Sequence, residues 1–477
     1  MRTIFFTVAL LLCSAAYGNT GESISLGYFD VDASPPIGSP MAYNTTNEVL
    51  SPLRCRGVVL LGAASPIVLC AVDWIEIAND GHRVFREELA RAAGTAIERV
   101  SVHVLHQHDA PWCDFSADQL AEEQGIHGEM FDSAFARDVI RRAAMAVRGA
   151  VKNAETVTHV GLGEGVVEEV ASNRRILGAD GKVKAVRYTS TKDPELRAAP
   201  EGVIDRKLKS ISFWNGERRI AELTYYATHP QSYYRTGKAN PDFPGMARDQ
   251  RQETSGVPHI HFNGAGGNIG AGKYNDGSHE LRGMLTDRVV KGMTRAWESE
   301  RRFSLTSKDV AWNVVSVALP LAPHLDEQRL VAKLTDKQLP NRARVKAACE
   351  LAWLRRCHRG DKIDIGCLSL GIARVLHLPG ELFVEYQLAA QELRPDLFVA
   401  MAAYGDCGPS YIGTNIAYEQ GGYETSPTSS LVAPEVETVL VEAIQKLVDA
   451  PRKPAETLGS EAAKQEIEFA RRNAPAK

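Results

Sequence analysis

Residues 100–112 read VSVHVLHQHDAPW. A β-branched run that ends in polar residues and then a proline predicts a buried strand that leads into a loop. Because side chains alternate between the two faces of a strand, we expect His106 and His108 to point to one side and Gln107 to the other. Two neighbouring neutral imidazoles suit a divalent metal, and zinc fits best. The alternative is a pair of histidines that cap the strand through hydrogen bonds to the backbone.

The sequence before this stretch predicts an α/β fold. Residues 57–61 and 66–73 are continuous apolar runs, which are typical of strands covered on both faces. Asp80 can cap a helix whose apolar positions, among them Phe85 and Leu89, keep helical spacing. The order strand, helix, strand favours a mixed β-sheet core with flanking helices and a site at the strand ends.

The rest of the chain continues this alternation. The dipeptide Asn215-Gly216 between two β-rich runs predicts a hairpin, and a helix is expected to begin near Ser278. Further strands are predicted at residues 26–32, 157–170, 368–378 and 397–404, and helices at residues 131–154, 325–356 and 432–447. We interpret the helical residues 325–356 as a surface excursion. We find no internal sequence repeat, and no Ser/Gly-rich linker marks a domain boundary.

Three later segments carry candidate site residues. The strand at residues 220–226 leads into Ala-Thr-His229-Pro, and residues 263–272 form a glycine-rich loop whose backbone N–H groups can approach a ligand oxygen. This loop lacks the Gly-Lys-Ser/Thr ending of a nucleotide-binding P-loop. The segment Pro-Gly-Glu381 places a carboxylate in the first turn of a predicted helix, residues 382–393. Each feature taken alone also has a structural explanation, such as a tight turn or a carboxylate at a helix N-terminus.

Composition and the two termini limit the class of protein. A formal net charge of -4 over 477 residues gives no basic footprint, so nucleic acid is not an expected partner. Residues 1–18 contain an apolar run followed by small residues, which predicts a cleaved signal peptide and a secreted or periplasmic protein. The cysteines outside this segment are odd in number and include no Cys-x-x-Cys pair, so a thiolate zinc site is not expected. Residues 451–477 are expected to form a charged, exposed tail.

Taken together, these segments resemble the neutral/alkaline (non-lysosomal) ceramidase family. The likeness rests on HQHDAP at residues 106–111, ATHP at 227–230, PGE at 379–381, and YIGT at 411–414 followed by GYE at 422–424. All four patches occur in the family's order. The resemblance implies that residues 19–450 form a ceramidase-like catalytic domain.

Carried over residue by residue, the resemblance also implies a set of roles. It implies zinc held by His106, His229, Glu381 and Tyr411, and a catalytic His108 beside the water that the zinc activates. Tyr418 is expected to be a second catalytic residue. Arg174, in a segment that resembles the family's Asn-Arg segment, and the loop residues Gly267 and Asn268 are expected to bind substrate.

The chain departs from the family in two places. Gly270 stands where the family has a serine, so a route that uses this serine as a nucleophile is closed, whereas a route through zinc and water is not. We also expect no C-terminal immunoglobulin-like domain, which follows the catalytic domain in the family. The implied function is a secreted zinc-dependent hydrolase of an N-acyl amide bond, in ceramide or another N-acylated amine. Its substrate would be small and amphipathic, which would allow transient contact with a membrane surface.

Two other readings of the sequence stay open. A (β/α)8 metal hydrolase also places a His-x-His at a strand end and would allow ester or lactone substrates, but this chain lacks eight evenly spaced strand-helix units. A non-catalytic ceramidase-like binding protein is the second alternative, which the glycine at position 270 permits.

Overall fold

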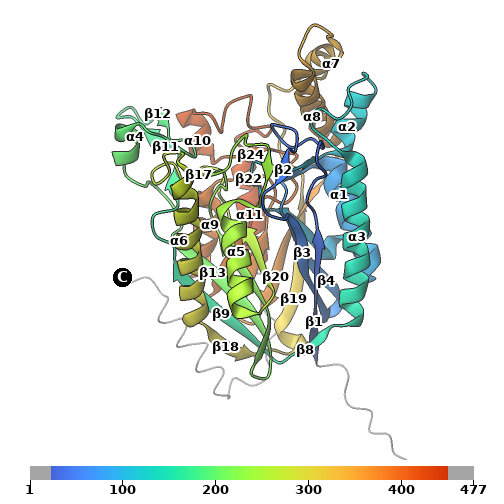
Figure 1. Cartoon of the computed structure of the whole chain (residues 1–477), viewed down its shortest axis with the longest axis vertical. Helices are drawn as coiled ribbons and strands as arrows, with labels where there is room; N and C mark the ends of the chain where they lie inside the picture. The colour runs from blue at the N-terminus through green and yellow to red at the C-terminus, as the bar shows by residue number, and fades with distance from the viewer. Residues whose placement is uncertain (1–22, 450–477) are drawn as a thin grey trace, which may run out of the picture.

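The computed structural model of the chain describes residues 23–449. The expected signal peptide and charged tail therefore lie outside the described residues. Within the described range, none of the helices combines the length and the hydropathy that a membrane span needs. The architecture is the mixed α/β fold that the sequence predicts, with several β-sheets and flanking helices (Figure 1).

Three units of secondary structure make up most of the fold. The first contains β1 (Ile24–Asp32), β3 (Arg54–Gly62), β4 (Ala64–Val72), α1 (Asn79–Ala93), β6 (Val100–Val104) and α3 (Ser133–Lys152). The second contains β9 (His159–Val166), β13 (Lys207–Asn215), β14 (Arg218–Tyr226), α5 (Asp242–Ser255), β16 (His259–Asn263) and α6 (His279–Glu298). The third contains β19 (Val310–Val317), β20 (Ile363–Leu370), β21 (Ala373–His377), α9 (Val384–Leu393), β23 (Phe398–Ala402) and α11 (Val436–Asp449).

These three units share one topology. In each, three antiparallel strands follow one another along the chain, and a helix then leads to a fourth strand that runs parallel to the third. The last helix of each unit packs on the unit's first two strands. The structure therefore repeats three times, although the sequence shows no repeat, because one fold accepts many different apolar residues.

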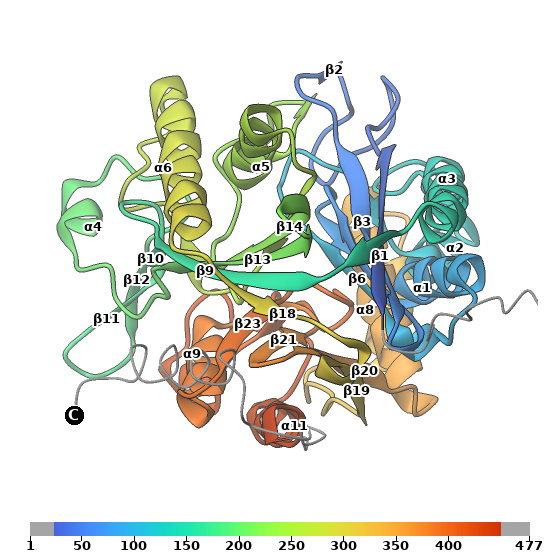
Figure 2. The same ribbon diagram turned by 90° about the horizontal axis from the view of Figure 1, so that it is seen from below.

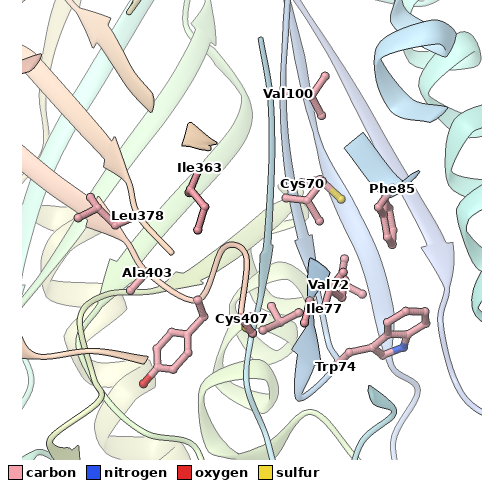
Figure 3. Close-up of a cluster of buried hydrophobic side chains, with 14 of the residues drawn as sticks. Cys70, Val72, Trp74, Ile77, Phe85, Val100, Ile363, Leu378, Ala403 and Cys407 are labelled. Carbon is pink, nitrogen blue, oxygen red and sulfur yellow. The ribbon is translucent and has the colours of Figure 1, made fainter. Parts of the chain in front are cut away.

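The three sheets enclose a common core, and the helices cover their outer faces (Figure 2). Val58, Phe213 and Val375, one from each sheet, are fully buried in this core. A second cluster lies between the first sheet and α1, where Cys70 and Phe85 pack together (Figure 3). Each large apolar side chain buried in this way contributes about 1.5–3 kcal/mol.

Short elements form the two ends of the molecule. In the upper part of Figure 1 lie the short strands β2 (Glu48–Val49), β11 (Arg175–Leu177), β12 (Val183–Val186), β17 (Ile269–Gly270), β22 (Glu381–Leu382) and β24 (Tyr411–Ile412). The remaining short strands are β5 (Glu76–Ile77), β7 (Trp112–Cys113), β10 (Ser172–Asn173) and β15 (Lys238–Ala239). The other helices are α2 (Phe115–Glu122), α4 (Pro194–Ala198), α7 (Glu327–Thr335), α8 (Asn341–His358), α10 (Asn415–Gln420) and the 3-10 turns η1 (Ile97–Arg99) and η2 (Ser307–Asp309). At the lower end, β8 (Glu155–Val157) and β18 (Arg301–Ser304) connect successive units (Figure 1).

The structure confirms most of the predicted elements and corrects several boundaries. The hairpin after Asn215 and the helix after Ser278 are present. Residues 368–378 form parts of two antiparallel strands rather than one, because Gly371 adopts a φ of 55° and turns the chain. Helix α1 begins two residues earlier than predicted, with Ala78 rather than Asp80 as its N-cap, so Asp80 lies in the first turn.

Two further expectations are wrong. The segment over residues 325–356 is not merely a surface excursion, because α8 buries Trp353, which is 2% exposed, in the same cluster as Cys70 and Phe85. The (β/α)8 alternative is excluded, since the described strands form several mixed sheets and not one parallel barrel.

Candidate active site

The fourth strands of the three units meet at their carboxyl ends. The backbone N–H of Val104 donates to the carbonyl of Tyr404, and the N–H of Ala403 donates to the carbonyl of Asn263, at 2.9 Å each. The Asn263 side chain closes this ring by donating to the carbonyl of Leu105 at 2.6 Å. Loops from all three units therefore converge on one point at the upper end of the molecule.

His106 reaches this point through a turn in the backbone. Strand β6 ends at Val104, so the expected alternation of faces does not extend to the histidines. His106 instead adopts a φ of 63°, which is uncommon for a residue with a side chain and typical of functional sites. Its Nδ1–H donates to the carbonyl of Ile75 at 2.7 Å, so Nε2 carries a lone pair that can bind a ligand. Gln107 points elsewhere, as expected, and donates to the Asp73 carbonyl.

Two more imidazoles and a carboxylate surround His106 Nε2. Glu381 Oε2 lies 3.1 Å from His106 Nε2 and 3.8 Å from His229 Nδ1, and the Nε2 atoms of His108 and His229 lie 3.4 Å apart. His106, His108 and His229 can each direct one ring nitrogen into a group whose members lie within 4.8 Å of one another. Glu381 is in β22 and not in the first turn of α9, which begins at Val384.

The donor set fits a cation. His229 Nδ1, His108 Nδ1 and Glu381 Oε2 are buried and have no hydrogen-bond partner in the described part of the chain. Burial holds the pKa of His108 and of His229 well below the ordinary value, and the neighbouring charges lower it further. Neutral imidazoles beside a carboxylate are metal ligands, and a bound cation would satisfy the unpartnered atoms.

Tyr411 stands beside Glu381 because β24 pairs with β22 in the register Glu381 to Tyr411. The Tyr411 hydroxyl accepts from Arg174 at 3.2 Å, and Arg174 is fixed in turn by Glu424 at 3.1 Å. Burial raises the pKa of Tyr411 well above its ordinary value, although Arg174 opposes this shift. A metal ion bound at the phenol oxygen would lower this pKa further.

The group opens into a cavity of about 870 Å³. His106, His108, Glu381, Arg174 and Tyr411 all line it. A cavity of this size can enclose most of a small organic substrate.

Three of the expected site residues lie elsewhere. Tyr418 is in α10, where its hydroxyl bonds to Ser430 Oγ at 2.8 Å, and it does not line the cavity. Asn268 is fully buried, with its amide nitrogen on Glu385 and its oxygen on the N–H of Val384 at 2.9 Å. Gly267 packs behind Glu381, because a Cβ added there would lie 2.2 Å from the Glu381 carbonyl oxygen. Gly267 thus packs against the backbone of Glu381, Asn268 holds the start of α9, and neither residue lines the cavity.

Several residues at the site carry no clear signal in the sequence. Tyr423 lines the cavity in the place expected of Tyr418, with its ring 5.8 Å from that of Tyr411. Tyr43 stacks on His108 at 5.7 Å. Tyr404 stacks on His106 at 4.6 Å and has a φ of 59°. Only Tyr404 could have been found in advance, since it follows the strand at 398–402 as His106 follows its own.

Comparison with known proteins bears on the fold. No protein-family model and no curated protein matches the sequence. A solved ceramidase complexed with C2 is similar over 91% of this chain and 76% of its own, with a TM-score of 0.64 and 16% identity. The neutral ceramidase from Pseudomonas aeruginosa gives a TM-score of 0.63 over 93% of this chain and 77% of its own, also at 16% identity.

This is the neutral ceramidase fold. The resemblance seen in four short patches of sequence is therefore confirmed at the level of structure. Residues 23–449 contain the ceramidase-like three-sheet unit and no immunoglobulin-like domain.

Proposed function

We propose that this chain is a zinc-dependent hydrolase of N-acyl amides, acting on ceramide or another N-acylated amine. The observation that carries the proposal is the buried group of His106, His108, His229 and Glu381 at the wall of a cavity of about 870 Å³. The ceramidase fold supports the reaction class, because the solved structures with this fold include a ceramidase complex.

His106, His229, Glu381 and Tyr411 would hold the zinc. When bound, zinc would polarise the substrate carbonyl and lower the pKa of water. The three-histidine set that includes His108 is the competing arrangement, since its ring nitrogens lie within 4.8 Å of one another. We assign His108 to proton transfer because the resemblance places it next to the ligands rather than among them.

The chain's own groups would then carry the remaining steps. His108 is neutral, with its pKa lowered by burial, so it can accept a proton from the attacking water and pass it to the leaving amine. Arg174, held by Glu424, can orient the Tyr411 hydroxyl and the substrate carbonyl. We assign hydrogen-bond donation to the developing oxyanion to Tyr423 rather than Tyr418, because Tyr423 lines the cavity. Such a donor contributes about 3–4 kcal/mol.

The location of the protein is part of the proposal. Residues 1–18 support export to the periplasm or the medium. Sequencing the N-terminus of the protein purified from whole cells and medium of its native host tests this: a mature chain that begins near residue 19 supports export, and an intact Met1 contradicts it.

Metal content and turnover test the function. Purified protein is analysed for zinc by mass spectrometry as wild type, His106→Ala, His229→Ala and His127→Ala. His127 is the matched control, because its side chain is 69% exposed and lies outside the cavity. We expect about one zinc per chain in the wild type and the His127→Ala control, and none in His106→Ala and His229→Ala. We also expect the wild type to cleave N-acyl amines in preference to the matching esters. No zinc in the reloaded wild type contradicts the proposal.

A further inference from the structure

One wall of the cavity carries two cationic side chains that form no ion pair within the described residues. Helix α8 contributes Arg342 and Lys346, which are one turn apart and both line the cavity. Arg342 donates to the Ala42 carbonyl, and its guanidinium carbon lies 5.3 Å from the centre of the Tyr43 ring. Lys346 donates to the Thr428 carbonyl at 2.8 Å. Neither side chain makes a salt bridge within residues 23–449.

The carboxylates around the cavity do not balance this wall. Glu381 belongs to the metal-binding group, and Arg174 is paired with Glu424. Glu76 is the other carboxylate that lines the cavity, and it can offset at most one of the two cations on α8. The wall therefore keeps a positive charge that a ligand could use.

A neutral donor lies in the same wall. Trp112 lines the cavity next to Glu76, with which it is paired between β7 and β5. Its indole Nε1–H is shielded from solvent and has no acceptor in the described part of the chain. A buried donor without a partner costs free energy, which a ligand that supplies an acceptor would recover.

We propose that this wall recognises an oxyanion, so that the preferred substrates are N-acyl amides whose amine portion carries a carboxylate, sulfonate or phosphate. The inference rests on the proposed function. Arg342 is already held by Ala42 and Tyr43, so little side-chain freedom is lost when its guanidinium binds an oxyanion. Because the acyl chain is apolar, the oxyanion of such a substrate belongs to its amine portion, which would then contact α8.

Matched substrates test the proposal. The kcat/KM of the wild type is measured for N-dodecanoylglycine, for its uncharged glycinamide, and for a cationic N-dodecanoylethylenediamine. The same measurement is made for N-dodecanoyl derivatives of longer ω-amino acids, N-dodecanoyltaurine and N-dodecanoylphosphoethanolamine. These substrates vary the distance between the amide and the oxyanion, and the kind of oxyanion. We expect an anionic substrate to be preferred over the uncharged one by at least about 10-fold, with the preference falling as salt is added.

Variants locate the effect. The double variant Arg342→Ala/Lys346→Ala should reduce the ratio of kcat/KM for the anionic substrate to kcat/KM for the uncharged one to about 1. Its kcat/KM for the uncharged substrate should change by less than about 3-fold. Lys337→Ala removes one positive charge from the neighbouring exposed loop, outside the cavity, and should leave the preference intact. A preference for the cationic or the uncharged substrate overturns the inference, as does a double variant that loses both activities equally.

Binding separates this inference from the proposed function. The dissociation constants of N-dodecanoylglycine and its glycinamide are measured by calorimetry with the His108→Ala variant. Tighter binding of the acid by about 10-fold, lost in the background of the α8 double variant, supports the anion site even if no amide is cleaved. Equal binding of acid and amide overturns the site, whatever the turnover assays show.

Discussion

The first and third units present the same backbone to the active site with different side chains. Glu76 and Glu381 each lie four residues beyond the end of the third strand of their unit. Each begins a short strand that pairs in parallel with another, in the registers Glu76 to Trp112 and Glu381 to Tyr411. The third unit thus offers a carboxylate and a phenol to a metal, whereas the first offers a carboxylate and an indole, which binds no metal.

The same relation holds for the loops after the fourth strands. His106 and Tyr404 each lie two residues beyond the strand end, with φ of 63° and 59°, and their rings stack at 4.6 Å. A repeated backbone therefore fixes where side chains meet, while the residue type at each equivalent position decides whether a metal can bind.

The carboxylate pair gives the largest expected difference. Glu381→Gln should lower zinc affinity by more than about 100-fold, because loss of an outer partner of a ligand already costs about 10- to 100-fold. Glu76→Gln, the same change at the equivalent position, should retain zinc. Competition with a chelator measures both affinities. Equal loss in the two variants would mean that the units share the ligand role.

The aromatic pair should give a smaller difference. Tyr411→Phe removes a phenol oxygen next to Glu381 and should lower zinc affinity by about 10- to 100-fold. We expect kcat/KM to fall together with the zinc affinity. Trp112→Phe should leave zinc affinity unchanged. The same chelator assay applies, and unchanged zinc binding in Tyr411→Phe would remove Tyr411 from the ligand set.

The carboxylate of the first unit, Glu76, also makes stability depend on pH. Burial, Glu381 and Asp114 raise the pKa of Glu76 well above its ordinary value, with Lys346 acting against this shift. A raised pKa means that the folded state holds the proton more tightly, so this stabilisation is complete at low pH and is lost as pH rises above about 4.5. In zinc-free protein, Glu76→Gln should therefore gain stability relative to wild type as pH rises, by up to about 1.4 kcal/mol per pH unit. Urea denaturation across this range measures it, and a constant difference contradicts the assignment.

The stacked pair should give the smallest effect. The Tyr404 hydroxyl is buried and has no hydrogen-bond partner among residues 23–449, so Tyr404→Phe should change the free energy of unfolding by less than about 1 kcal/mol and leave zinc bound. His106→Ala, at the equivalent position, should lose the metal. Loss of zinc in Tyr404→Phe would show that the hydroxyl belongs to the metal site.

The sequence predicts the site best where a strand end fixes the side chain. His106, His108, His229 and Glu381 each follow a strand, and the structure brings all four together. The turn at His106 could not be foreseen, because a positive φ in a residue other than glycine depends on tertiary contacts such as the Trp74 carbonyl that holds its N–H at 2.9 Å.

The sequence predicts the site least well in loops and at long range. The residues after Tyr411 do not reveal which tyrosine returns to the cavity, so Tyr418 was expected where Tyr423 lies. A glycine-rich loop predicts backbone N–H groups that a ligand can approach, yet Gly267 is packed tightly against Glu381. The cations of α8 reach the cavity only through tertiary packing of a segment that resembles a surface helix.

The placement of the connections between units has a practical consequence. Strands β8 and β18, through which the chain passes from one unit to the next, lie at the end of the molecule opposite the active site (Figure 1). A circular permutation or a split after Ser304 would therefore leave every loop of the active site uncut. Two separately expressed fragments that reassemble would report their association by regaining zinc, since His106 and His229 would come from one fragment and Glu381 from the other.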